Sequence, residues 1–81
     1  MKAMPLNLIA GGQPHKIIEI VAGLEARKKL ISLGIHVGDE ILKLNHSRWS
    51  PVLIRNLTTR SSKIAIGQGL AKKILVGDAR L

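Results

Sequence analysis

The residues best suited to hold a metal ion lie in one short segment, at His36, Asp39 and Glu40. On a helix, this i, i+3, i+4 spacing would bring an imidazole and two carboxylates to one face, where they could bind a divalent cation. Gly34 and Gly38 instead indicate a turn that leads into a strand. We therefore expect no resident cofactor, and we keep a weak divalent-metal site at His36, Asp39 and Glu40 as an alternative.

Three consecutive basic residues, Arg27, Lys28 and Lys29, lie in a segment of good helix formers. At about 100° per residue their side chains spread over roughly 200° of a helix, so they cannot bind one phosphate together. They are either a solvated helix surface or the rim of a docking site for an acidic partner. The residues predicted to contact such a partner are Arg27, Lys28, His36 and Arg55.

Catalytic motifs are missing from the sequence. The serines have no flanking sequence of an activated nucleophile. The segment Gly67-Gln68-Gly69-Leu70 resembles half of a phosphate-binding loop, but it lacks the remaining glycine or lysine of the complete motifs. A chain of 81 residues builds one core and hardly has room for a substrate pocket of about 300 Å³ or more. We predict that the protein is not an enzyme.

The charge balance indicates an acidic partner, because thirteen Lys and Arg against five Asp and Glu give a net charge of +8. Nucleic acid, an anionic membrane surface and an acidic protein face are all candidates. Small barrels that bind single strands stack bases on several aromatic side chains, whereas Trp49 is the only aromatic residue here. Among the functional hypotheses given at the end of this section, nucleic-acid binding therefore ranks third. Trp49 lies in a turn, where it either covers the core as a lid or stands exposed as a contact residue.

The elements that would position these residues are mostly short strands. Charged residues alternate with aliphatic ones between frequent turn signals, as in strands with one solvated face. In these strands we expect Ile18 and Ile20, and Leu42 and Leu44, to face the core, with Lys43 outward. The exception is segment 24–33, whose apolar spacing and following Gly34 predict a helix. The predicted strands are 16–21, 40–44, 52–55, 63–66 and 74–76, with a helical turn at 68–73.

This element order predicts a mainly β fold. Five short strands cannot hide their edges in an open flat sheet, and curling into a barrel removes most of those edges. We therefore predict one domain over residues 1–81: a small SH3-like barrel of about five strands, with one α-helix after the first strand and a short helical turn before the last. The chain has no cysteine and no run of about 20 apolar residues, so we expect a cytoplasmic protein without membrane insertion. Association into a homo-oligomer stays open.

Two sequence blocks carry a family resemblance. Leu-x-x-Leu-Gly-Ile-x-x-Gly spans residues 30–38, and Ala-Ile-Gly-x-x-Leu-Ala-x-x-Ile spans residues 65–74. Together with the opening Met4-Pro5-Leu6, these blocks resemble the ferrous iron transport protein A family over essentially the whole chain. The matching residues are mostly determinants of the fold, so the resemblance transfers no catalytic set.

The resemblance implies a function that composition alone does not supply. It implies a small cytosolic accessory protein of ferrous iron uptake, which acts on a membrane transporter whose cytosolic part has a GTP-binding domain. It also implies an SH3-like barrel. The first hypothesis is therefore a module that binds the cytosolic domain of that transporter. The alternatives are a metal-responsive module and, after it, a basic barrel that binds nucleic acid.

Overall fold

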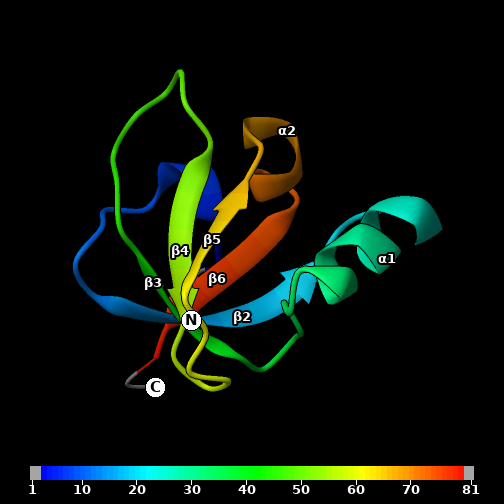
Figure 1. Ribbon diagram of the computed structural model, residues 1–81, viewed down its shortest axis with the longest axis horizontal. Helices are drawn as coiled ribbons and strands as arrows, with labels where there is room; N and C mark the ends of the chain where they lie inside the picture. Colours follow the sequence, from blue (N-terminus) through cyan, green and yellow to red (C-terminus); the bar gives the residue numbers. More distant parts are fainter. Residues whose placement is uncertain (1–2, 80–81) are drawn as a thin grey trace.

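The computed structural model describes residues 3–79, so the ends of the predicted 1–81 domain, residues 1–2 and 80–81, lie outside the described part. Figure 1 shows the strands crossing at a common centre, with the longer helix to one side and the shorter one at one end. The elements are β1 (Met4–Pro5), the 3-10 turn η1 (Leu6–Leu8), β2 (Pro14–Ile20), α1 (Leu24–Ser32), β3 (Glu40–Lys43), β4 (Val52–Asn56), β5 (Lys63–Ile66), α2 (Gln68–Ala71) and β6 (Ile74–Asp78).

The strands form one antiparallel sheet of six, in the order β1-β6-β2-β3-β4-β5. The predicted mainly β class, the helix and the late helical turn are confirmed. The prediction of about five strands missed β1, a two-residue strand that pairs Met4 with Val76 and Pro5 with Leu75. The helix therefore follows the second strand. The order ends at β1 and β5, so the pairings do not show closure into a barrel.

Aliphatic side chains from every strand except β1, and from both helices and η1, fill the core. Burial of such side chains is the main favourable contribution to folding, at about 25 cal/mol per Å² of apolar surface. The helices are held mainly by this packing, since α2 has only four residues. The buried hydrophobic residues are Leu6, Ile9, Ile17, Ile20, Leu30, Ile35, Ile41, Val52, Ile54, Ile66, Ala71, Ile74 and Val76.

Helix α1 ends in a glycine cap that directs the chain back to the core. Gly34 has a φ of 87° and its N–H donates to the Ile31 carbonyl at 2.9 Å, while the Ile35 N–H donates to the Leu30 carbonyl at 3.0 Å. These two bonds form a Schellman motif, which satisfies carbonyls that the helix end leaves free. Leu30 and Ile35 are both fully buried, so the cap also joins the helix to the core.

Replacing Gly34 by Ala is expected to lower the free energy of unfolding by about 1–2 kcal/mol, because a β-carbon is strained in the left-handed region. A Cβ at this position would meet no atom within 4 Å, so the expected loss comes from the backbone angle. Urea unfolding followed by circular dichroism measures it. Gly69→Ala is the matched control, because Gly69 lies inside α2 without a positive φ, and an added Cβ there would also meet no atom within 4 Å. Equal losses in the two variants would contradict the explanation.

A β-bulge in β2 overturns the predicted inward face of this strand. We expected Ile18 and Ile20 to face the core, but Ile17 and Ile20 are buried and Ile18 is only partly buried. The register between β2 and β6 shifts between Ile17 and Glu19. The extra residue of a bulge changes the parity of the strand, so residues three apart can face the same side.

The inward face of β3 is also opposite to the prediction of Leu42 and Leu44. Ile41 and Lys43 are buried, at 0% and 4% exposure. In an antiparallel pair, directly opposite residues lie on the same face, and Lys43 is opposite Ile54 of β4, which is fully buried. The pairing with β4 therefore decides which face of β3 is buried. The buried face carries Ile41 and Lys43, although the face with Leu42 and Leu44 is more apolar.

Candidate functional site

Several exposed apolar side chains lie on helix α1 or in the segments that flank it. The side chains of Val21, Leu24, Ile31 and Val37 are each more than half exposed. Ile31 and Val37 also line a pocket of about 120 Å³. We call these residues and the pocket the helix-side surface. The pocket is lined by Ile20, Arg27, Ile31, Ile35, His36 and Val37.

Arg27 fixes the position of α1 relative to β2. Its Nη1 donates to the carbonyl of Ile20, the last residue of β2, at 2.9 Å. The same side chain lines the pocket. Arg27 therefore supplies positive charge at the pocket, while the aliphatic part of its side chain extends the apolar wall.

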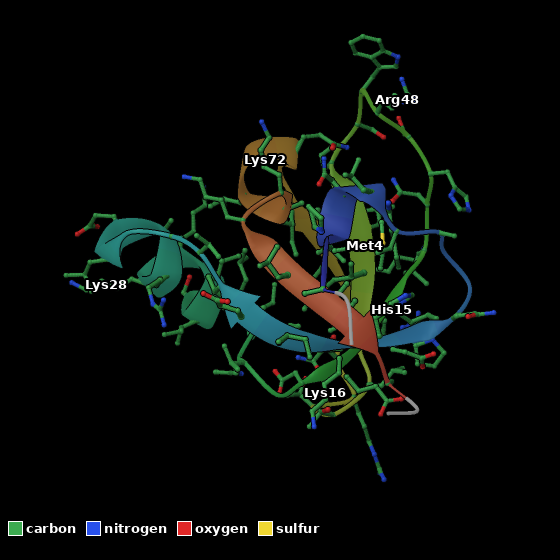
Figure 2. The ribbon with its side chains drawn as sticks, turned by 180° about the vertical axis from the view of Figure 1, so that it is seen from behind. Met4, His15, Lys16, Lys28, Arg48 and Lys72 are labelled. Atoms are coloured by element: carbon green, nitrogen blue, oxygen red, sulfur yellow. The ribbon has the colours of Figure 1, made fainter. Side chains whose placement is uncertain are left out.

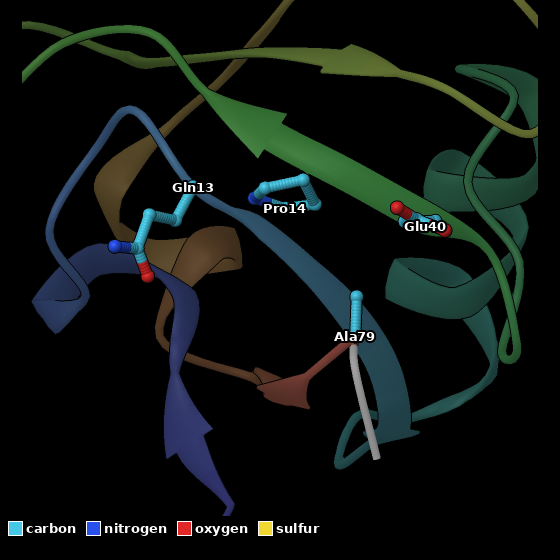
Figure 3. A pocket seen from close by; sticks show the side chains of 4 residues that line it. All are labelled: Gln13, Pro14, Glu40 and Ala79. Atoms are coloured by element: carbon cyan, nitrogen blue, oxygen red, sulfur yellow. The ribbon is translucent and has the colours of Figure 1, made fainter.

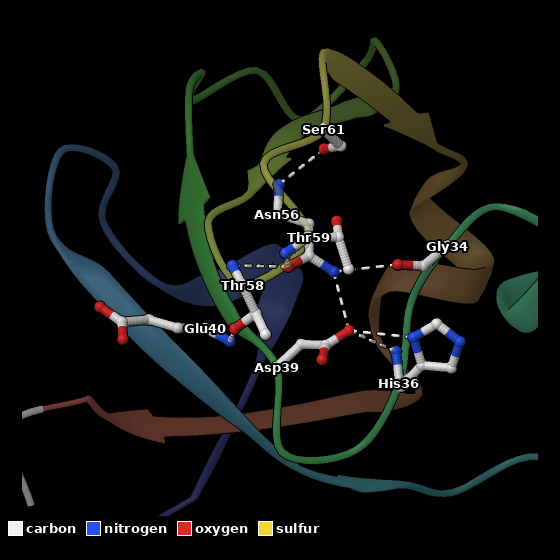
Figure 4. A network of polar contacts seen from close by, with 8 residues as sticks. All are labelled: Gly34, His36, Asp39, Glu40, Asn56, Thr58, Thr59 and Ser61. Carbon is white, nitrogen blue, oxygen red and sulfur yellow. Dashed lines mark hydrogen bonds and ion pairs between the residues drawn. The ribbon is translucent and has the colours of Figure 1, made fainter.

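A second predicted contact residue, His36, is held at the pocket by Asp39 (Figure 4). Asp39 Oδ2 accepts a hydrogen bond from the His36 N–H at 3.0 Å and lies 3.1 Å from His36 Nδ1. The Asp39 N–H donates in return to the His36 carbonyl. These contacts close the turn over residues 36–39, and half of the His36 side chain remains exposed.

Asn56, buried at the end of β4, organises the interior of this turn (Figure 4). Its Nδ2 donates to Asp39 Oδ2 at 2.8 Å and to the Gly34 carbonyl at 2.9 Å. Its Oδ1 accepts hydrogen bonds from the N–H groups of Thr58 and Thr59. One side chain thus joins the end of α1, the turn before β3 and the turn after β4.

The network determines the ionisation of Asp39. Burial raises the pKa of this carboxyl group, but the hydrogen bonds from the Asn56 side chain and from the side chain and backbone of His36 together outweigh it. The net pKa of Asp39 is lowered from 3.8. Asp39 is therefore a charged structural acceptor at neutral pH.

The three residues of the alternative metal site are brought together only in part. His36 and Asp39 are in contact, but Figure 4 shows the Glu40 side chain pointing away from both. The Glu40 N–H donates to Thr58 Oγ1 at 2.8 Å, and its side chain lines a different pocket. Among residues 3–79, no group of three His, Cys, Asp or Glu side chains is placed to hold a metal ion.

That other pocket, of about 240 Å³, lies between β2, β3 and the end of the described chain (Figure 3). Its lining residues are Gln13, Pro14, Glu40 and Ala79. Glu40 is the single ionisable residue among them, so the described lining offers no acid–base pair and no nucleophile.

The remaining predicted contact residues, Lys28 and Arg55, are both exposed. Lys28 follows Arg27 on α1, next to the helix-side surface. Arg55 lies in β4, opposite Leu42 and Lys63, and β3 separates its strand from β2. It is not among the residues that line the pocket, and its role in partner binding stays a prediction.

Trp49 is 95% exposed. Of the two alternatives for this residue, the exposed position is confirmed and the lid is wrong.

None of the helices between residues 3 and 79 is long and apolar enough to span a bilayer.

Sequence reasoning missed two buried polar residues, Lys43 and Asn56. Lys43 Nζ donates to the carbonyls of Asn7 and Ile9, at 3.1 and 2.8 Å. These bonds hold the segment before β2 against β3. The alternation of β4 could have predicted the burial of Asn56. Side chains two residues apart in a strand share a face, so Asn56 lies on the same face as the buried Val52 and Ile54. Nothing comparable in the sequence indicates a buried Lys43.

Comparison with known proteins places the chain in a family. The family model of the FeoA domain matches residues 4–77. A candidate Fe(2+) transport protein A of Methanocaldococcus jannaschii is 41% identical over 75 residues, which cover 93% of this chain and 87% of that protein.

Solved structures agree with the sequence match. The crystal structure of an iron uptake regulatory protein (FeoA) superposes with a TM-score of 0.83 and 30% identity, over 94% of this chain and 97% of that one. A FeoA-like protein from Clostridium acetobutylicum superposes with a TM-score of 0.81 and 28% identity, over 98% and 90% of the two chains. The fold, the matched length and the sequence identity together show that this chain belongs to the FeoA family, the ferrous iron transport proteins A.

Proposed function

We propose that this protein is an accessory protein of ferrous iron uptake that binds the cytosolic part of the membrane ferrous iron transporter, which carries a GTP-binding domain. Membership of the FeoA family, a non-enzymatic family, supports the role in iron uptake. The related crystal structure is described as an iron uptake regulatory protein. Regulation by a protein without catalysis requires binding, so the question is which surface binds.

The helix-side surface is the observation on which this proposal depends. Leu30 is the only buried residue of α1, whereas Leu24 and Ile31 on the same helix are 67% and 56% exposed. Exposed apolar side chains gathered around a pocket are typical of a protein-binding surface. The pocket of about 120 Å³ is smaller than the 300–1,000 Å³ or so of small-molecule sites. It suits a single apolar side chain of a partner.

Charge around this surface supports an acidic partner. Arg27 and His36 line the pocket, and the exposed Lys28 follows Arg27 on the helix. Complementary charge at an interface rim accelerates association and determines orientation more than it adds affinity. Docking would act on the transporter by shifting its conformational equilibrium, provided that the protein binds one conformation more tightly than the other.

Replacing Ile31 by Glu is expected to weaken binding to the transporter's isolated cytosolic domain about ten-fold or more, because the carboxylate must be desolvated against an apolar pocket. Titration calorimetry near physiological salt measures this. Leu8→Glu is the matched control, because Leu8 is an apolar residue of similar exposure in η1, outside the helix-side surface. Lack of binding by the unaltered protein would refute the proposal, and equal losses in both variants would refute the assigned surface.

The same titration can compare the contributions of the predicted basic contact residues to binding. Lys28→Gln is expected to weaken binding more than Arg55→Gln, because Lys28 adjoins the helix-side surface and Arg55 does not line its pocket. The difference should shrink as salt is raised, since exposed charges are screened over about 10 Å at 0.1 M. A larger effect of Arg55→Gln would move the interface to the face of β4.

A further inference from the structure

The loop between β3 and β4 presents the only aromatic residue of the chain to solvent. Trp49 is 95% exposed, and the loop extends beyond α2 at one end of the molecule (Figure 1). Figure 2 shows its neighbour Arg48 at the far end of this loop. Neither residue lines the pocket at the helix-side surface.

Hydrogen bonds hold this loop in shape without help from the indole ring. Ser47 Oγ accepts hydrogen bonds from the N–H groups of Trp49 and Ser50, both at 3.1 Å. Gln68 Nε2 of α2 donates to the carbonyls of Ser47 and Ser50, at 3.0 and 2.8 Å. These hydrogen bonds therefore hold the loop in a defined conformation, and the tryptophan side chain is left free for an external contact.

Two cationic residues lie at the same end of the molecule. Arg48 belongs to the loop, and Lys72 directly follows α2, whose Gln68 donates to the loop carbonyls. Figure 2 places Arg48 and Lys72 toward one end and Lys16 toward the opposite end. We call residues 45–51 together with Lys72 the tryptophan end. The five acidic residues all lie outside this set, at Glu19, Glu25, Asp39, Glu40 and Asp78.

We propose that the tryptophan end contacts an anionic lipid bilayer, with the Trp49 ring at the level of the headgroups and Arg48 and Lys72 beside lipid phosphates. Tryptophan prefers this interface because its ring is apolar and its N–H is polar. A bilayer receives a projecting side chain without a preformed pocket, whereas a specific protein partner must match about 800 Å² of surface. The convex, basic loop therefore favours a lipid surface over a protein.

Such a contact is reversible, because one ring and a few cations form a weak anchor. It would keep the protein next to the membrane while leaving the helix-side surface available. The proposal does not rest on transporter binding, since the lipid itself is the ligand. It can therefore be tested on vesicles that contain no protein, and its failure would leave the proposed docking function untouched.

The fluorescence of Trp49 reports the contact directly, because no other residue of the chain is aromatic. The full chain is titrated with vesicles of phosphatidylcholine alone, and with vesicles of phosphatidylcholine and phosphatidylglycerol. We expect the emission to shift to shorter wavelength only with the anionic vesicles. Raising the salt should reverse the shift, because the attraction to the anionic surface is screened within a Debye length.

Charge variants distinguish this end from general basicity. Arg48→Gln and Lys72→Gln are each expected to lower vesicle affinity about five-fold, as for one basic residue near an anionic surface. Lys16→Gln is the matched control at the opposite end and should change the affinity by much less. Co-sedimentation of Trp49→Ala with anionic vesicles should show a clear loss of bound protein.

Three results would overturn the proposal. The emission could stay unchanged with anionic vesicles. Lys16→Gln could lower the affinity as much as Arg48→Gln, in which case net charge alone drives binding. The emission could shift on adding the transporter's cytosolic domain while vesicles have no effect, which would make the tryptophan end a protein-binding surface.

Discussion

Replacing Asn56 by Ala is expected to lower the free energy of unfolding by about 3–5 kcal/mol, because a buried polar group left without its partner costs about 1–3 kcal/mol. The substitution removes two donors, to Asp39 and Gly34, and one acceptor that serves two N–H groups. Some of these groups can reach water in the variant, so the total is less than the sum. Urea unfolding followed by circular dichroism measures the loss, since the exposed Trp49 is a poor reporter of unfolding.

The same substitution should change the response to acid. The pKa of Asp39 is lowered in the folded protein, so this residue stabilises the fold above its ordinary pKa of 3.8. That contribution is lost as pH falls through the lowered folded value. Without the Asn56 hydrogen bond the folded pKa of Asp39 moves upward, and the acid-induced loss becomes smaller than in the unaltered protein.

Arg55→Ala is the matched control for both measurements, because Arg55 precedes Asn56 in β4 but is exposed. We expect it to change stability by no more than about 0.5 kcal/mol. A loss of that small size for Asn56→Ala, or an unchanged acid response, would show that water replaces the network at little cost.

Replacing Lys43 by Met is expected to destabilise the protein by about 2–4 kcal/mol, because it leaves two main-chain carbonyls without their donor. Those carbonyls belong to Asn7 and Ile9. Methionine keeps much of the volume of lysine, so a cavity contributes little to the expected loss. Urea unfolding at neutral pH measures the difference from the unaltered protein.

Alkaline pH separates Lys43 from the other lysines. Burial lowers the pKa of Lys43 from 10.5, so the unfolded chain binds this proton more tightly than the folded chain. The Lys43 contribution to stability therefore rises with pH, from the lowered folded pKa up to the unfolded value, and is constant below that window. This rise should be absent in Lys43→Met.

Lys63→Met is the matched control, because Lys63 is an exposed lysine of β5. It should leave both the neutral-pH stability and the alkaline rise close to those of the unaltered protein. If Lys43→Met is as stable as Lys63→Met, the contacts of Nζ with the two carbonyls do not stabilise the segment before β2.

The local pattern of the sequence was enough to predict several of the helices and strands. The spacing of apolar residues over 24–33 and the glycine after them predicted α1, because helix period and cap chemistry are local properties. Alternation in β4 predicted burial of Val52 and Ile54, which are 1% and 0% exposed. The basic residues around Arg27 led to the prediction of partner contacts on this helix, and their role in binding stays a prediction.

Faces of strands were predicted less well, because they depend on partners far away in sequence. Over residues 40–44, the sequence Glu-Ile-Leu-Lys-Leu permits either face to be buried, and the local pattern favours the two leucines. The pairing with β4 reverses this preference. The carbonyls of Asn7 and Ile9, more than 30 residues away, then satisfy the buried amine.

In the candidate site too, the sequence predicted one contact correctly and the strand geometry prevented another. His36 and Asp39 are close in sequence and lie in contact, but Glu40, one residue further on, belongs to a strand whose alternation sends its side chain to another pocket. Adjacent residues of a strand point to opposite faces. Proximity in sequence was therefore a poor guide to a three-residue cluster at a turn-to-strand junction.

The sequence by itself determined α1 and its cap, every strand except β1, and the family, because each depends on local chemistry. Tertiary structure decided which face of β2 and β3 is buried, where the buried Lys43 and Asn56 find their partners, and which apolar residues remain exposed around α1. These features depend on strand register, a bulge and contacts between distant segments, and no local pattern specifies them.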